Sequence, residues 1–158
     1  MGDDDIPRQQ PNSHNCYVCG LKNAYGLQLV FFDNGEDQVW CDYAIPAHYE
    51  GYPGVAHGGV VAAILDEICG RATMIADLNH FMMTAKMEVK YRCPVPLNVK
   101  LRAVGRVSRR RGRLAQARGE LWLPDGQLAA EATLILADLP EQLSGQKSLD
   151  DLGWRVYD

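Results

Sequence analysis

The chain has 158 residues, of which 47% are apolar and 23% are charged, and its formal net charge is −4. This length and composition are typical of one folded domain and exclude a disordered chain. An acidic net charge argues against a general affinity for nucleic acid or anionic membranes. The longest strongly apolar run, Val60 to Leu65, is much too short to span a bilayer.

The N-terminal residues, 1–15, are acidic and polar, and we expect them to form a flexible tail. They have neither the basic start nor the apolar stretch of a secretory signal, and Ile6 breaks the myristoylation pattern. The cysteine count, five, is odd, which fits buried thiols in a reducing compartment better than a disulfide framework. A cytoplasmic location is the resulting expectation.

In chain order, the patterning predicts strands over residues 27–32 and 38–44, a long helix over His57–Leu78, and strands over 84–93, 97–107, 113–123 and 127–137. Turn sequences at 33–35 and 124–126 join the first pair and the last pair of strands. The one-sided alternation indicates antiparallel strands with one covered face. The order β-β-α-β-β-β-β therefore predicts an α+β fold, in which a curved antiparallel sheet wraps around one long central helix.

The domain is expected to span residues 16–139 and to be followed by a C-terminal extension, 140–158, with a short helix and an aromatic anchor at Trp154. One face of the strand at 113–123 carries small residues at three successive positions, namely Ala115, Ala117 and Gly119. We expect the helix to approach the sheet closely there.

Two adjacent carboxylates interrupt the apolar helix. Glu67 has Arg71 four residues later, the favourable order for an exposed ion pair, so we interpret Glu67 as structural. Asp66 has no such partner and lies on a stripe of small residues that includes Gly70. Glycine costs about 1 kcal/mol in a helix interior, so its presence indicates close packing of another group. An aspartate bonded to local backbone or water remains the alternative to a catalytic one.

The helix begins at His57-Gly58-Gly59. The first amides of a helix lack intrahelical partners and carry partial positive charge, and glycine lets a substrate approach them closely. Such N–H groups can stabilise an oxyanion that develops on a carbonyl. A glycine-rich loop that only sets the turn into the helix is the simpler alternative.

The spacing of these features constrains how they can act together. Gly58 and Asp66 are eight residues apart, about 12 Å along one helix axis, which is too far to serve one carbonyl easily within one subunit. Two helices antiparallel across a two-fold axis would bring Gly58 of one subunit to Asp66 of the other. We therefore expect a dimer with two shared sites, whose joined sheets would also cover a strand edge.

Three segments of the chain resemble the hotdog-fold thioesterases, in particular the phenylacetate-pathway type. They are HGGVVAAILDE (57–67), MTAKMEVKYRCPVPL (83–97) and CYVCGLKNAYGLQL (16–29). The resemblance extends over residues 16–138. Its most specific part combines His-Gly-Gly, a carboxylate nine residues after the His, and the alternating strand that ends in CPVPL.

The resemblance implies the hotdog fold and the hydrolysis of acyl-CoA thioesters, with coenzyme A entering as part of the substrate and no other cofactor. In that scheme Gly58 donates its N–H to the thioester oxygen, Gly59 supports it, and His57 positions the carbonyl. Asp66 of the facing subunit acts on water as a general base, or attacks as a nucleophile through an anhydride; both routes stay open.

Two threonines are further candidates for substrate binding. Thr84 matches a threonine that assists in part of the family, although it also fits a solvent-facing strand position. Some relatives place Ser or Thr one turn after the carboxylate to hold the water, where this chain has Gly70, so Thr73 is the candidate for part of that water-holding role.

An arginine cluster lies around the turn between the strands at 97–107 and 113–123. Arg109, Arg110, Arg111 and Arg113 can bind the phosphates of coenzyme A, or can simply form a solvated hairpin.

A His-x-Cys-x-x-Cys pattern is formed by His14, Cys16 and Cys19. Zinc needs a fourth ligand, and no second Cys-x-x-Cys or neighbouring histidine supplies one. We therefore expect no metal, and a packed N-terminal flap instead.

The leading hypothesis is thus a cytoplasmic acyl-CoA thioesterase that forms a homodimer, or a homotetramer as a dimer of dimers, and binds neither nucleic acid nor membrane. A non-catalytic acyl-CoA-binding module or sensor on the same fold is the alternative. Asp66 argues against it, because a pure binder needs no carboxylate beside the thioester. A hydratase of the same superfamily would carry Asp and His within one short motif, and that spacing does not occur around the helix.

Overall fold

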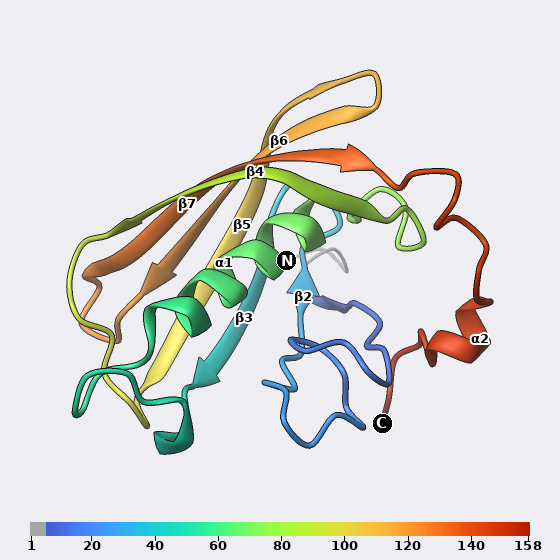
Figure 1. The fold of residues 1–158 in the computed structure, drawn as a ribbon. Helices are drawn as coiled ribbons and strands as arrows, with labels where there is room; N and C mark the ends of the chain where they lie inside the picture. The colour runs from blue at the N-terminus through green and yellow to red at the C-terminus, as the bar shows by residue number, and fades with distance from the viewer. Residues whose placement is uncertain (1–5) are drawn as a thin grey trace.

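A computed structural model describes residues 6–158 as a seven-stranded antiparallel sheet that curves around one main helix (Figure 1). The helix is α1 (Gly58–Ala72), and the strands are β1 (Arg8–Gln9), β2 (Phe32–Asp33), β3 (Val39–Ala44), β4 (Met82–Tyr91), β5 (Lys100–Arg111), β6 (Leu114–Trp122) and β7 (Leu128–Asp138). A 3-10 helix, η2 (Ala47–Tyr49), and a short helix, α2 (Leu149–Leu152), complete the fold. The sheet order is β1-β2-β3-β5-β6-β7-β4, and the predicted fold class and element order are confirmed, with β1 as an addition.

The helix is shorter than predicted, because it ends at Ala72 and not at Leu78. Two side chains, one from the C-cap residue and one from β5, donate to carbonyl groups at its end. The Thr73 hydroxyl donates to the Gly70 carbonyl oxygen at 2.7 Å, and Arg110 Nη2 donates to the Thr73 oxygen at 2.8 Å. These donors replace the N–H groups of a further helical turn, so the chain can leave the helix there.

Two strands also begin later than predicted. The first is reduced to Phe32–Asp33, and β5 starts at Lys100 instead of residue 97. Just before β5, Asn98 adopts a φ of 57°, a left-handed conformation that interrupts an extended strand.

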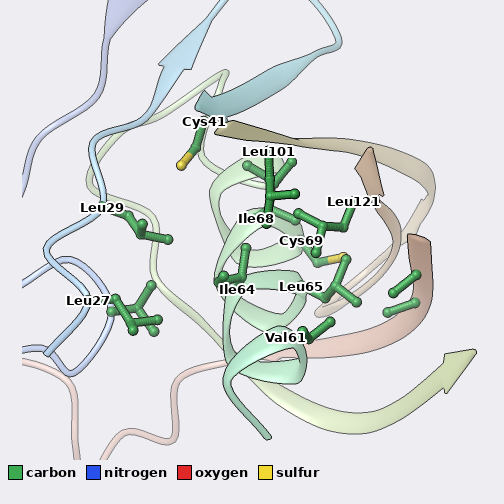
Figure 2. Close-up of a cluster of buried hydrophobic side chains, with 14 of the residues drawn as sticks. Leu27, Leu29, Cys41, Val61, Ile64, Leu65, Ile68, Cys69, Leu101 and Leu121 are labelled. Atoms are coloured by element: carbon green, nitrogen blue, oxygen red, sulfur yellow. The ribbon is translucent and has the colours of Figure 1, made fainter. Parts of the chain in front are cut away.

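The helix lies unusually close to the middle of the sheet, as the small residues predicted. A Cβ built on Gly105 would lie 2.5 Å from the Ile68 carbonyl oxygen, and one on Gly119 would lie 3.0 Å from Cys69 Sγ. Figure 2 shows the apolar side of α1 between Leu121 on one side and Leu27 and Leu29 on the other. Two glycines in neighbouring strands therefore let the helix pack directly against the backbone of the sheet.

Both ends of the described chain pack on the domain. Gln10 and Asn12, which were expected in a flexible tail, are fully buried, and Asn12 forms a bridge with Arg155. Residues 1–5 of the expected tail lie outside the described residues. Near the C-terminus, the predicted short helix and the Trp154 anchor are confirmed, since Trp154 Nε1 donates to the Leu78 carbonyl oxygen at 3.0 Å.

Within residues 6–158, no helix has both the length and the apolar character needed to cross a membrane. All five cysteines are free, and none is fully exposed.

The close packing of α1 on the sheet can be tested with two glycine substitutions. We expect Gly105→Ala to lower the free energy of unfolding by about 1–3 kcal/mol, because the new methyl group overlaps rigid helix backbone. Gly70→Ala is the matched control: nothing lies within 4 Å of a Cβ there, so the better helix propensity should add about 1 kcal/mol. Urea unfolding measures both, and equal stability of the two variants would contradict the close packing.

Candidate active site

Asp66 lies in the middle of α1 and faces a cavity of about 500 Å³. Thr84 Oγ1 donates a hydrogen bond to Asp66 Oδ1 at 2.6 Å. The rest of the cavity wall is mainly apolar and includes Met74, Phe81, Met82, Met83, Leu136 and Trp154. The carboxylate is therefore oriented by a hydroxyl at the wall of a largely hydrophobic space.

A β-bulge in β4 explains why Thr84 points toward the helix. The pairing with β7 shifts between Thr84, which lies opposite Leu136, and Lys86, which lies opposite Ile135. Because Ala85 is the extra residue, Thr84 shares the covered face of the sheet with Met87. The uninterrupted alternation that the sequence predicted would have placed Thr84 on the opposite face.

The beginning of α1 forms a second candidate group. His57 is the N-cap, and its Nδ1 accepts a hydrogen bond from the Gly59 N–H at 2.9 Å. A neutral His57 in this bond carries its proton on Nε2, which remains available as a donor. Tyr91 Oη donates to the Gly58 carbonyl oxygen at 2.8 Å, so the glycine is held against the end of β4.

The two glycines at the start of α1 differ in what they can donate. The Gly59 N–H, expected to support an oxyanion, is already used by His57. In the part of the chain that the structure describes, no acceptor is paired with the Gly58 N–H. Gly58 is therefore the amide at the helix start that is free to bind a ligand.

These two groups lie in different cavities of the single chain. His57, Gly58 and Tyr91 line a cavity of about 880 Å³, whereas Asp66 and Thr84 line the cavity of about 500 Å³. Within one chain the structure does not bring the predicted oxyanion donor to the predicted carboxylate, in agreement with their spacing along the helix.

The Glu67–Arg71 ion pair is present, with Arg71 Nε 2.9 Å from Glu67 Oε1, but it is not exposed as predicted, because Arg71 is buried and Glu67 is partly buried. Arg71 is 2% exposed; its guanidinium lies over the rings of Phe31 and Trp154, and its Nη1 donates to the Pro11 carbonyl oxygen. Burial raises the pKa of Glu67 to about 7, although the charge of Arg71 acts in the opposite direction. The pair thus joins α1 to both terminal segments.

Cys16 and Cys19 line the same cavity as Asp66. The pKa of Cys19 is lowered to about 5, chiefly by its hydrogen bond with Cys16, and the pKa of Cys16 is raised for the same reason. Among residues 6–158, Cys16, Cys19 and Glu67 form the one group of possible metal ligands, with ligand atoms within 4.8 Å of one another. His14 is not part of this group and packs near Tyr157 instead.

The remaining predicted binding residues lie elsewhere. Thr73 is 2% exposed and caps the helix end, so the structure gives it a structural position in place of the expected water-holding one. Arg109, Arg110 and Arg111 lie at the end of β5 and line neither cavity described above. Arg110 is opposite buried Ala115 and reaches the helix end, so the arginines do not form one patch.

The family model described as the thioesterase superfamily matches residues 53–130, which include the start of α1, Asp66 and Thr84. The predicted resemblance to the thioesterase superfamily is therefore confirmed.

Relatives of this chain include the rat acyl-coenzyme A thioesterase THEM4 (Rattus norvegicus), 34% identical over 90 residues that make up 56% of this chain and 38% of the relative. The corresponding protein of Xenopus laevis is 29% identical over 70% of this chain and 49% of the relative. The chain thus spans less than half the length of these curated relatives.

Solved structures confirm the hotdog thioesterase architecture. RHA08564, a thioesterase superfamily protein, has a TM-score of 0.71 and 30% identity, over 80% of this chain and 61% of the other. The acetyl-CoA-bound protein smu.793 from Streptococcus mutans has a TM-score of 0.60 and 20% identity, over 65% of this chain and 81% of the other.

The structural importance of the buried ion pair can be measured directly. We expect Arg71→Ala to lower the free energy of unfolding by about 3–5 kcal/mol, because Glu67 loses its partner in a buried position. The control, Arg111→Ala, removes an exposed arginine and should change stability by less than about 0.5 kcal/mol. Chemical denaturation compares the two variants, and a small loss for Arg71→Ala would show that the pair does not hold the terminal segments.

Proposed function

We propose that the protein is an acyl-CoA thioesterase in which Asp66 activates water or attacks the thioester, and the Gly58 N–H stabilises the oxyanion. The observation that carries this proposal is the Thr84–Asp66 hydrogen bond of 2.6 Å at the wall of an apolar cavity. A binding module would have no use for an oriented carboxylate at this place. The relatives named as acyl-coenzyme A thioesterases support the same reaction class.

The proposed chemistry follows from the two groups. The Gly58 N–H lies at the positive end of α1 and can donate to the thioester oxygen as it gains negative charge. Thr84 occupies Asp66 Oδ1, which leaves the other carboxylate oxygen to remove a proton from water or to attack the carbonyl carbon. In the first route the activated water adds to the carbonyl carbon and the coenzyme A thiolate leaves. In the second route the Asp66 carboxylate displaces that thiolate, and water then hydrolyses the acyl–Asp66 anhydride. Both routes end with a free carboxylic acid and coenzyme A. His57, through Nε2, helps to position the carbonyl.

We infer that the complete site forms between two subunits. Asp66 and Gly58 line separate cavities in one chain, and an antiparallel partner helix would bring them together. β4 is one of the two edge strands of the sheet, so its free edge can pair with the same strand of a second subunit. Thr84 and Tyr91, which contact the two groups, both belong to this strand.

The substrate would divide between two environments. The apolar wall of the cavity beside Asp66, with Met82, Met83 and Phe81, suits an acyl chain. The exposed guanidinium groups of Arg109 and Arg111 suit the phosphates of coenzyme A, whereas Arg110 is already bound to the helix end. The free thiols support a cytoplasmic location for this reaction.

The role of Asp66 is tested by steady-state hydrolysis of a panel of acyl-CoA substrates. We expect Asp66→Asn to reduce kcat by about 10²–10⁴-fold, because the amide can neither accept the proton nor attack. Asp77→Asn changes an exposed acid beyond the end of α1 and should leave kcat within about twofold. Undiminished hydrolysis by Asp66→Asn would remove Asp66 from the mechanism; no hydrolysis of any acyl-CoA by the unmodified protein would favour the binding module.

Shared sites predict complementation between two inactive variants. Gly58→Val should abolish activity by blocking the approach of the carbonyl, as Asp66→Asn should by removing the carboxylate. When the two variants are co-expressed and assemble at random, about a quarter of all sites combine an intact Gly58 with an intact Asp66. We therefore expect the mixed protein to show about a quarter of the activity of the unmodified protein. If both groups acted within one chain, the mixed protein would stay inactive.

A further inference from the structure

The loop that carries Cys16 and Cys19 has the geometry of a metal-binding turn. The N–H groups of Val18 and Cys19 donate to Cys16 Sγ at 3.4 and 3.5 Å, and the Gly20 N–H donates to the Cys16 carbonyl oxygen at 2.8 Å. A Cβ on Gly20 would lie 2.4 Å from that carbonyl oxygen, so this close turn requires glycine. When a metal binds Cys16 as a thiolate, these amides can donate to its negatively charged sulfur.

Glu67 places a third possible ligand beside the two cysteines from a distant part of the chain. Its carboxylate comes from α1, and one of its oxygens and both cysteine sulfurs lie within 4.8 Å of one another. Glu67 Oε1 accepts from Arg71, which leaves the other oxygen for a cation. The sequence pattern alone suggested no ligand beyond His14 and the two cysteines, because residues so far apart in the chain are not recognisable as neighbours.

We propose that Cys16, Cys19 and Glu67 bind one Zn²⁺ ion. Two thiolates and a carboxylate are a donor set that zinc accepts, and all three residues line the cavity beside Asp66, from which water can occupy the fourth position. The negative charges of the three ligands are balanced by the ion together with the buried Arg71 guanidinium. Bound zinc would fasten the N-terminal loop to α1 one residue away from Asp66.

This site is separate from thioester hydrolysis and can be tested without substrate. Reduced protein, treated with chelator and then dialysed, is titrated with Co²⁺ alone and with Zn²⁺ alone. We expect one metal ion per chain, with the thiolate-to-cobalt charge-transfer and ligand-field bands of a tetrahedral site. Zn²⁺ should displace Co²⁺ and abolish these bands.

Three substitutions locate the ion. Cys16→Ser and Cys19→Ser should each weaken binding by more than about 100-fold, since loss of a ligand should exceed the loss seen for residues that merely orient one. Cys93→Ser, which changes a half-buried thiol at the other cavity, should bind as the unmodified protein does. Circular dichroism during thermal unfolding confirms that each variant is folded.

Several outcomes would overturn the proposal. They are the absence of Co²⁺ binding by the reduced protein, a bound metal without thiolate charge-transfer bands, and binding that survives both Cys16→Ser and Cys19→Ser. If the reduced protein binds no metal and Cys16 and Cys19 instead form a disulfide on mild oxidation, the pair is a redox site and not a zinc site.

Discussion

The close contact between α1 and the middle of the sheet is the constraint on which the rest of the structure depends. Gly105 and Gly119 have no side chains, so the backbone of α1 can approach two neighbouring strands around Ile68. This contact sets the height of the helix above the sheet. The height in turn decides which residues of β4 reach the helix, and therefore that Thr84 meets Asp66 and Tyr91 meets Gly58.

Much of this arrangement is predictable from the sequence because it depends on local periodicity. The alternation over β4 to β7 and the apolar run of α1 specify the element order, and the small residues of β6 indicate where the helix lies. The separation of Gly58 from Asp66 follows from helix geometry alone. The two groups accordingly line two cavities of the folded chain.

Features that arise from contacts between distant segments could not be predicted in this way. The pattern Glu67-x-x-x-Arg71 identifies the ion pair, but its burial depends on Phe31 and Trp154, which come from opposite ends of the chain. The end of α1 depends on Arg110, which a bulge in β5 directs toward Thr73. A bulge leaves no mark in a pattern of alternating residues, so the placement of Arg110 and Thr84 was not recognisable.

The bulge at Ala85 also has a consequence for the outer edge of the sheet. A regular edge strand offers the same hydrogen-bonding pattern at every second residue, so a second strand can slide along it and still pair. The extra residue in β4 breaks this translational equivalence, because the edge before Ala85 is out of phase with the edge after it. A strand that pairs in a shifted register, as in aggregation, therefore cannot match the hydrogen-bonding groups on both sides of Ala85. Only a partner aligned to one register can pair along the full length of β4.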